Sequence, residues 1–324
     1  MGSKGVTRLR EPSLPRVDLV AIGASSGGLK ALKALLAGLP VDTGAAFVVV
    51  VHLDPTRPSE LAKILREWTA MPVVPVSERT KLSADTVYVI APNRALSLSG
   101  DAIAASPFKT PRGHRAPIDM FFRAISELPN AGTVIVLSGA GSDGAVGVAA
   151  VRERGGLVLA QDPEDAEFPS MPRAAIAVGV DAVLSADRLG PRIGELVQAR
   201  NRVGDSSLGA EPDFLLKRIF ARIKERSGHD FSQYKRPTIL RRIARRMQIT
   251  QTIDLETYAE RLGTDPVECQ ALFRDLLISV TRFFRDPAAF EALRTQALAP
   301  LFETEKAEPP NTATPNTGPP NAGP

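Results

Sequence analysis

The sequence predicts a doubly wound α/β domain with a mostly parallel sheet, followed by a small all-α domain. Between residues 17 and 200, short runs rich in β-branched residues alternate with longer helical patterns, and several of the runs are apolar throughout. Continuous apolar runs are typical of parallel strands that helices cover on both faces. Beyond residue 211 the strand pattern stops, and only helical periodicity continues.

Six strands are expected from the apolar runs. In order they are Val17–Ala24, Ala45–His52, Thr86–Ala91, Thr133–Ser138, Gly156–Gln161 and Asp181–Leu184. Helices are expected in the intervals. In the first interval, Leu29–Leu39, leucines recur at helical spacing, and Gly38 with Pro40 provides a stop signal.

With 324 residues, the chain is long enough for more than one folded unit. We expect an N-terminal extension at 1–16, the α/β domain at 17–200, a polar linker at 201–211, a helical domain at 212–302 and a disordered tail rich in proline, asparagine and threonine at 303–324. The tail carries too few apolar side chains to offset the entropy lost on ordering.

The composition excludes several classes of protein. Hydrophobic residues make up 44% and charged residues 23%, as in ordinary globular proteins. The apolar run at 45–51 is too short to cross a bilayer, and residues 1–16 lack a signal-peptide core. Cys269 is the only cysteine, and the three histidines show no metal-ligand spacing. We therefore expect a cytoplasmic protein without membrane insertion, bound metal or cofactor.

A tight turn follows the first expected strand. The stretch Gly23-Ala24-Ser25-Ser26-Gly27 fits G-x-S-x-G, the pattern of a nucleophile elbow between a strand and a helix. In such a turn the Ser25 hydroxyl projects over the carboxyl ends of the strands, beside helix N-terminal amides that stabilise an oxyanion. A plain turn built from glycine and serine gives the same pattern, so that interpretation stays open on this motif alone.

Two further side chains that suit acyl transfer follow apolar strands. His52 ends the second strand, and Asp143 follows the fourth. Because parallel strands end at one edge of a sheet, both are expected near Ser25, with His52 as the base and Asp143 orienting its ring. His114 lies in a polar loop and His229 beyond the linker, so both suit this role less well.

The loop that holds Asp143 allows a different function. Gly139, Gly141 and Gly144 also fit G-x-G-x-x-G, with Asp162 at the end of the next strand, as in a dinucleotide-binding oxidoreductase. Against this alternative, the Asp143 carboxylate would stand in the turn whose amides should meet an anionic pyrophosphate.

Five ordered motifs carry a resemblance to a known family. They are IGASSGG at 22–28, VVVHLDP at 49–55, RAPIDMFF at 115–122, LSGAGSDGAVG at 137–147 and QDPEDAEFPSMPRAAI at 161–176. Together they resemble the chemotaxis receptor methylesterases (CheB-type). The resemblance implies hydrolysis of glutamate γ-methyl esters on a methylated chemoreceptor or related signalling protein, and deamidation of glutamine by the same acyl-enzyme route.

The resemblance also assigns roles to residues. It maps the catalytic triad onto Ser25, His52 and Asp143. It places the residues that support the oxyanion and the active site at Ser26, Gly27, Ala140 and Gly141. Ala140 departs from the family, which usually has methionine or threonine there; a backbone donor survives this change, but packing beside the ester is altered.

The second domain resembles a different protein of the same system. The stretches HDFSQYKRPTILRRIARRM at 229–247 and LLISVTRFFRDPAAFEAL at 276–293 resemble the N-terminal helical part of the chemotaxis receptor methyltransferases (CheR-type). We expect neither a receiver domain before the first strand nor an S-adenosylmethionine-binding domain after residue 302. Methyl transfer and control by receiver phosphorylation are therefore not expected.

Positive charge is concentrated in this second domain. Residues 217–246 contain eleven Lys or Arg against two acidic residues. Helical spacing places Arg241, Arg242, Arg245 and Arg246 on one cationic face, which the resemblance assigns to docking on an acidic receptor helix. A solvated basic helix is the alternative, and nucleic-acid binding is not expected because few aromatic residues interleave with the basic ones.

A non-catalytic receptor-binding adaptor is the alternative function of the whole chain.

Overall fold

The computed structural model describes residues 17–54, 57–108, 111, 115–129, 131–203, 213–277 and 291–298. The chain divides into two compact units, Met1–Ile278 and Ser279–Pro324. In the second unit the described part is a short helical segment at 291–298 that ends in a π-helical turn, Arg294–Leu298. All other elements belong to the first unit.

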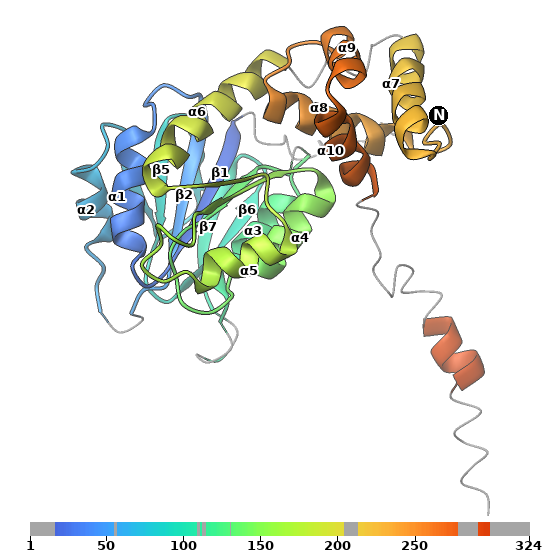
Figure 1. The fold of residues 1–324 in the computed structure, drawn as a ribbon. Helices are drawn as coiled ribbons and strands as arrows, with labels where there is room; N and C mark the ends of the chain where they lie inside the picture. Colours follow the sequence, from blue (N-terminus) through green and yellow to red (C-terminus); the bar gives the residue numbers. More distant parts are fainter. Residues whose placement is uncertain are drawn as a thin grey trace, which may run out of the picture. The chain divides into compact units, whose positions relative to one another are not determined.

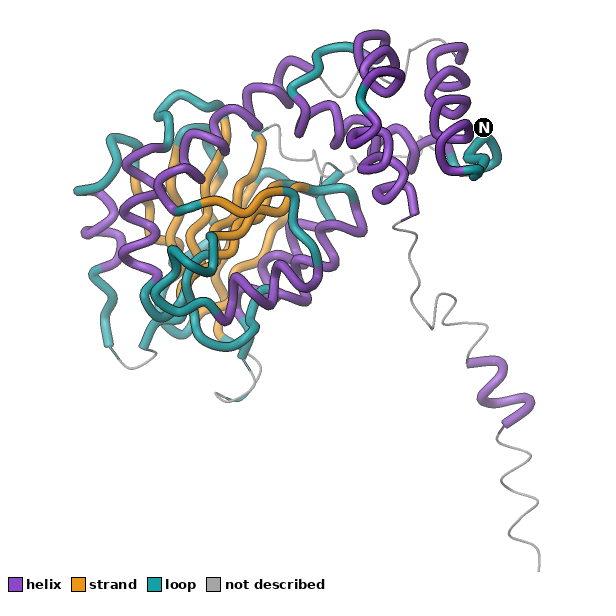
Figure 2. The backbone as a smooth tube through the Cα atoms, viewed as in Figure 1, coloured by secondary structure: helices purple, strands orange, loops and turns teal. Residues whose placement is uncertain are grey.

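A seven-stranded parallel sheet forms the centre of the first unit (Figure 1, Figure 2). Its strands are β1 (Asp18–Ala24), β2 (Ala45–Val51), β3 (Val73–Val76), β5 (Thr86–Ile90), β8 (Thr133–Val136), β9 (Leu157–Gln161) and β10 (Ala182–Leu184). They lie in the order β10-β9-β8-β1-β2-β5-β3, and every neighbouring pair is parallel. The chain therefore leaves β1 first toward β2 and later returns to its other side at β8.

Helices cover both faces of this sheet, as Figure 1 shows. On one face lie α1 (Gly28–Gly38), α2 (Leu61–Arg66) and α6 (Ala186–Val203); on the other lie α3 (Pro117–Ser126), α4 (Ala145–Arg154) and α5 (Ser170–Val178). Alternate residues of each strand face opposite layers: in β1, Val20 and Ile22 join one core, and Leu19 and Ala21 join the other. Burial on both faces explains why the strands are apolar throughout.

Four helices follow the sheet and share a core of their own. They are α7 (Asp213–Ser227), α8 (Arg236–Thr250), α9 (Leu255–Thr264) and α10 (Pro266–Leu277). Phe231, Tyr258 and Leu272 lie within this core with exposed fractions of 1% or less, and Cys269 is buried there as a free thiol. The predicted fold class, a doubly wound sheet followed by an all-α part, is confirmed.

The six predicted strands are all present, each within two residues of its expected ends, and the first predicted helix is α1. Two features were not predicted. One is the edge strand β3, and the other is a separate three-stranded sheet of β4 (Thr80–Lys81), β6 (Arg94–Ser99) and β7 (Ala102–Pro107).

The predicted linker needs a partial correction. Helix α6 continues through Val203, so the first three residues of the expected linker at 201–211 are helical. Residues 204–212 lie outside the described residues, as do the expected N-terminal extension at 1–16 and the expected tail at 303–324.

The predicted cationic docking face on α8 is wrong for three of its four arginines. Arg242 and Arg245 are only 3% and 2% exposed, and Arg246 pairs with the Glu268 carboxylate. Arg241 is the exposed member of the set. Helical spacing correctly placed these side chains together, but the face they share packs against protein instead of solvent.

The buried arginines join the helical part to the α/β part. Arg242 donates to the backbone carbonyls of Arg152 and Glu153, at the C-terminal end of α4, where a cation also interacts favourably with the helix dipole. Burial lowers the pKa of Arg242 to about 10. Arg245 lies between the carboxylates of Asp181 and Asp275. These contacts hold both parts in one compact unit.

Among the described residues, none of the helices has the length and apolar character needed to cross a bilayer.

Candidate active site

The turn after β1 fixes the position of Ser25. The strand ends at Ala24, and α1 begins at Gly28, which leaves three residues to reverse from strand to helix. Gly27 has φ 71°, a left-handed conformation that favours glycine. A Cβ atom at Gly27 would also lie 2.7 Å from the Ser138 Oγ atom. Both constraints require glycine at this position, and together they hold Ser25 at the carboxyl end of the sheet.

Ser25, His52 and Asp143 form one chain of hydrogen bonds. The Ser25 Oγ atom lies 2.9 Å from His52 Nδ1, and His52 Nε2 lies 2.8 Å from Asp143 Oδ2. The three residues follow β1, β2 and β8, which are neighbours in the sheet. The structure thus brings together the three side chains that the sequence predicted to converge.

The carboxylate of Asp143 determines the tautomer of His52. An ionised carboxylate only accepts hydrogen bonds, so Nε2 carries the proton and Nδ1 accepts from the Ser25 hydroxyl. In the serine protease triad the two ring nitrogens have the opposite roles. The His52 side chain is 36% exposed and that of Asp143 only 10%, so the imidazole is partly open to solvent while the carboxylate is shielded.

Helix α3 holds the Asp143 carboxylate in place. Asp143 Oδ1 accepts from the backbone N–H of Asp119 at 2.8 Å, and Oδ2 accepts from that of Ile118 at 3.1 Å. Both amides belong to the first turn of α3, where unpaired N–H groups and the helix dipole stabilise an anion. These two contacts therefore hold the carboxylate in one orientation.

The Asp119 side chain makes a similar contact between α3 and α4. Its Oδ1 atom accepts from the backbone N–H of Gly147, in the first turn of α4, at 2.8 Å. Burial raises the pKa of the Asp119 carboxyl, and the charge of Asp143 adds to this increase. Sequence reasoning did not identify Asp119, although an acidic residue in a first turn that begins at Pro117 is a recognisable helix-start signal.

Ser138 joins the two loops of the site. Its Oγ donates to the carbonyl of Ser26 at 2.9 Å and accepts from the backbone N–H of Phe168 at 3.0 Å. Its carbonyl accepts from the N–H of Ser25 at 2.9 Å. Sequence reasoning noted Ser138 only as the end of a strand; its role depends on contacts between segments far apart in the chain, which leave no local pattern.

The four predicted support residues lie in the two loops around Ser25. Ser26, Ala140 and Gly141 are exposed, and Gly27 is half-buried. Within the described part of the chain, the backbone N–H groups of Ser26 and Ala140 donate to no protein acceptor. A Cβ atom at Gly139 would lie 2.9 Å from the Cβ of Ser25, so the second loop approaches the serine closely. Unused amides beside a serine hydroxyl can stabilise an oxyanion.

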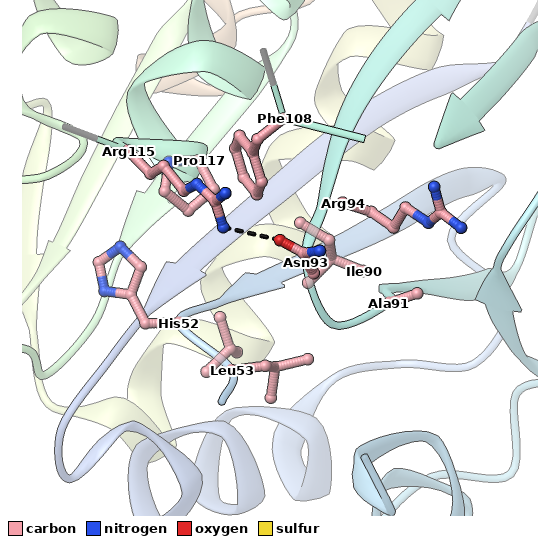
Figure 3. Close-up of a pocket in the computed structure, with 10 residues that line it drawn as sticks. His52, Leu53, Ile90, Ala91, Asn93, Arg94, Phe108, Arg115 and Pro117 are labelled. Atoms are coloured by element: carbon pink, nitrogen blue, oxygen red, sulfur yellow. Dashed lines mark hydrogen bonds between the residues drawn. The ribbon is translucent and has the colours of Figure 1, made fainter. Parts of the chain in front are cut away.

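His52 lines two cavities. One has a volume of about 640 Å³ and is lined by Ser25, Ser26 and His52 among others. The other, of about 380 Å³, is shown in Figure 3 and does not include Ser25. Val51, His52 and Leu53 line both.

The other histidines do not compete with His52 in the described structure. His229 lies in the helical part, where its Nδ1 atom is 3.1 Å from the Ser227 carbonyl and its ring packs on Phe273. His114 lies outside the described residues. No group of three metal-ligating side chains occurs in the part of the chain that the structure describes.

The dinucleotide alternative conflicts with the geometry of the glycine-rich loop. The first-turn amide of Gly147 in α4 already donates to the Asp119 carboxylate. Asp143, in the same loop, contributes a second carboxylate, which accepts hydrogen bonds from two amides in the first turn of α3. A pyrophosphate at this turn would meet two anions and a helix N-terminus that is already occupied, instead of open N–H groups.

Comparison with known proteins identifies two regions of the chain. A family model described as CheB methylesterase matches residues 20–193, and one described as CheR methyltransferase, all-alpha domain, matches residues 215–277. The crystal structure of the Thermotoga maritima CheB methylesterase catalytic domain aligns with a TM-score of 0.51 and 26% identity, over 56% of this chain and 98% of that one.

Curated relatives resemble part of this chain in sequence, and the chain spans about a quarter to a half of the length of the first two. An uncharacterized 104.1 kDa protein of Rhodobacter capsulatus is 38% identical over 266 residues, which is 74% of this chain and 28% of that protein. A protein-glutamate methylesterase/protein-glutamine glutaminase of Burkholderia orbicola is 36% identical over 187 residues, 56% of this chain and 55% of that protein.

This chain covers almost the whole length of a third relative. It is a putative protein-glutamate methylesterase/protein-glutamine glutaminase of Leptospira interrogans, 34% identical over 175 residues, which is 53% of this chain and 91% of that protein. The chain belongs to the CheB methylesterase family, and its methylesterase region is followed by a region that matches the all-alpha domain of CheR methyltransferases.

Proposed function

We propose that this chain hydrolyses γ-methyl esters of glutamate residues in a chemoreceptor, with Ser25 as nucleophile, His52 as general base and Asp143 as the group that orients and stabilises His52. The observation that carries the proposal is the continuous hydrogen-bond chain from the Ser25 hydroxyl to the Asp143 carboxylate. Membership of the methylesterase family and the names of its relatives supply the substrate class. We place the reaction in the cytoplasm, in the α/β domain at 17–200.

The observed geometry supports the following acylation step. His52 Nδ1 accepts the Ser25 proton as Oγ attacks the ester carbonyl, and the imidazolium that forms is stabilised by Asp143 through the Nε2–H bond. The tetrahedral intermediate carries its negative charge beside the unused amides of Ser26 and Ala140. Collapse returns the proton from Nδ1 to the leaving methoxide, so methanol departs and the glutamyl group stays on Ser25.

Deacylation reuses the same groups. Water takes the position that methanol has left, His52 removes its proton, and the hydroxide attacks the acyl carbon. The products are a glutamate carboxylate and the regenerated serine. A glutamine side chain enters the same cycle with ammonia in place of methanol, which is the second activity in the names of the relatives.

The main competing function is a receptor-binding adaptor that keeps the fold but performs no chemistry. A fluorophosphonate probe separates the two, because it reacts with an activated serine and not with an ordinary surface hydroxyl. We expect one probe molecule on Ser25 by peptide mass spectrometry, and no labelling of Ser25→Ala. Labelling of His52→Ala should be slower by at least two orders of magnitude, since the base is lost.

An unlabelled wild-type chain, shown to be folded by circular dichroism, would favour the adaptor. Labelling on another serine would place the nucleophile elsewhere. Ser142→Ala provides a matched control, because Ser142 is an exposed serine in the neighbouring loop and has no part in the proposed relay.

A further inference from the structure

Two helices next to the site begin without a capping side chain of their own. Helix α3 has Ala116 at its N-cap and α4 has Gly144, and neither N-cap residue makes a side-chain hydrogen bond to its helix. The first amides of a helix have no partner within the helix, so they need acceptors from elsewhere. Two carboxylates meet them here, that of Asp143 at the start of α3 and that of Asp119 at the start of α4.

The two carboxylates form a reciprocal arrangement. Asp143 directly precedes Gly144, the N-cap of α4, and its side chain accepts from the first turn of α3. Asp119 lies in that first turn of α3, and its Oδ1 atom accepts from the backbone N–H of Gly147, in the first turn of α4, at 2.8 Å. The backbone N–H of Asp119 is also one of the donors to Asp143, at 2.8 Å. Asp119 therefore contacts the segment around Asp143 twice, through its backbone and through its side chain.

Close packing of α3 on α4 leaves these contacts little freedom. A Cβ atom at Gly147 would clash with the Phe122 Cβ atom and would lie 3.1 Å from the carbonyl oxygen of Asp119. The backbones of the two helices thus approach closely at the residue whose N–H Asp119 accepts. A shift of α4 along α3 would break the bond from Gly147 to Asp119 and would move the loop that carries Asp143.

The Asp119 carboxylate is held in an unfavourable environment. Burial raises the pKa of this carboxyl most strongly, the hydrogen bond from the Gly147 amide lowers it, and the charge of Asp143 raises it again. Two like charges therefore lie next to each other beside the candidate active site. Such arrangements reduce stability and are common where a protein performs chemistry.

We infer that Asp119 is a positioning residue for the esterase reaction: by capping α4 from the first turn of α3, it fixes the loop that carries Asp143 and thereby the bond from His52 to Asp143. The inference rests on the proposed function. In the described structure Asp119 makes no hydrogen bond to Ser25 or His52, so it acts through Asp143. If Asp143 were displaced, the His52 ring could turn, and its Nδ1 atom would no longer be directed at the serine.

Replacement of Asp119 tests this role through kcat and KM separately. Asp119→Ala removes the acceptor for Gly147. We expect its kcat for methanol release from a γ-methyl glutamate peptide to fall roughly 10²-fold, the effect of a small misplacement of a catalytic group, with KM within about twofold of wild type. Asp119→Asn keeps an acceptor oxygen on a side chain of the same length, so its kcat should recover to within about threefold of wild type. Equal kcat values for wild type, Asp119→Ala and Asp119→Asn would overturn the inference.

Asp254→Ala is the matched control for the loss of a helix cap. Asp254 caps α9, where its Oδ1 atom accepts from the backbone N–H of Thr257 at 2.7 Å. This variant should lose stability, as cap removals do, and keep the wild-type kcat at matched folded concentration. A fall in kcat as large as that of Asp119→Ala would attribute both losses to stability and overturn the inference.

A second variant covers the case in which Asp119→Ala does not fold. Asp119→Glu keeps the charge but moves the carboxylate by one methylene group, so it should not restore the bond from Gly147 in its present geometry. We expect a loss of kcat in the same direction. Wild-type kcat in the folded Asp119→Glu chain would overturn the inference.

A spectroscopic measurement separates this inference from the esterase proposal, because it requires no turnover. In a chain with nitrogen-15 in its histidine rings, the Nε2 proton that bonds to Asp143 gives a signal in proton NMR, and His52→Gln assigns it by its disappearance. We expect this signal in wild type and Asp119→Asn, and its loss in Asp119→Ala. Absence of methanol release by a wild type that shows the signal would contradict the esterase proposal alone. Persistence of the signal in folded Asp119→Ala would overturn the positioning role of Asp119.

Discussion

At the scale of single residues, the site depends on which nitrogen of His52 carries the proton. Asp143 accepts two backbone N–H bonds from α3 in addition to the Nε2–H bond. These three hydrogen bonds hold its carboxylate in one orientation. This arrangement leaves Nδ1 as the basic atom toward Ser25. In the proposed reaction, the carboxylate that stabilises the imidazolium is itself positioned by a helix N-terminus.

Replacing Asp143 should remove activity without removing the fold. In Asp143→Asn the amide nitrogen would donate to Nε2 or face the α3 amides, so the tautomer with a basic Nδ1 is lost along with the negative charge. We expect kcat for ester hydrolysis to fall roughly 10³- to 10⁴-fold, as in serine hydrolases that lose this carboxylate. Steady-state methanol release measures it, with circular dichroism as the control for folding; a loss below tenfold would contradict the role given to Asp143.

Asp119 should affect stability in a manner that depends on pH. Its folded pKa is raised by burial, so the folded state binds the proton more tightly than the unfolded state does. Stability from this group is therefore present at low pH and is lost as pH rises from the unfolded value, about 3.8, through the folded pKa. Asp119→Asn keeps an oxygen acceptor for Gly147 and removes the charge.

We therefore expect the melting temperature of Asp119→Asn to exceed that of wild type at pH 7, with the difference shrinking toward pH 4. Thermal unfolding at both pH values provides the measurement. A variant that is less stable than wild type by the same amount at pH 4 and pH 7 would show that the buried charge is not the unfavourable feature.

At the scale of elements, the strands that build the site could be predicted and the small strands could not. β1, β2 and β8 are buried on both faces and read as continuous apolar runs, which also located the residues that follow them. β3 is a four-residue edge strand with a proline at its third position, and such strands carry little signal. The hairpin of β6 and β7 mixes alanine and serine with few large apolar residues, so its alternation is weak.

The site residues could likewise be predicted only where a local sequence pattern marks them. Ser25, His52 and Asp143 could be located because Ser25 and His52 directly follow strands of the parallel sheet and Asp143 lies in the loop after a third strand. Asp119 and Ser138 act through contacts with segments distant in sequence. Sequence periodicity indicates which residues share a face and not what that face contacts, which is why the arginines of α8 were expected to form an exposed docking face.

The glycine of the β1–α1 turn offers a test at this scale. Gly27→Ala introduces both a left-handed alanine, which costs about 1–2 kcal/mol, and a Cβ atom 2.7 Å from Ser138 Oγ. Gly228 has a similar φ of 75° and open space around its Cβ position, so Gly228→Ala carries the conformational cost alone. We expect the larger loss of melting temperature and the loss of activity in Gly27→Ala only. Equal effects of the two substitutions would show that the contact with Ser138 is unimportant.

At the scale of the whole molecule, the helical part is fastened to the α/β part by buried arginines. Arg245 lies between Asp181, which precedes β10, and Asp275 of α10, and it also donates to the Gly156 carbonyl. Arg242 meets the C-terminal end of α4, and the N-terminal end of the same helix follows Asp143. One helix therefore contacts both the attached part and the active-site loop.

Removing Arg245 should destabilise the first unit strongly. Arg245→Ala leaves two buried carboxylates without their shared cation, and breaking a buried pair in this way costs about 3–5 kcal/mol. Arg241→Ala, four residues earlier on the same helix and exposed, should change the free energy of unfolding by less than about 0.5 kcal/mol. Urea denaturation measures both values. Similar values for the two variants would mean that Arg245 is not at a buried interface.

The most direct test of the central claim is methanol release from a receptor fragment that carries glutamate γ-methyl esters, with wild type and Ser25→Ala at equal folded concentration. If Ser25, His52 and Asp143 perform the chemistry, the wild type releases methanol in proportion to the ester supplied, and Ser25→Ala releases it at the rate without protein. Equal release by the two chains, or none by the folded wild type, would contradict the account.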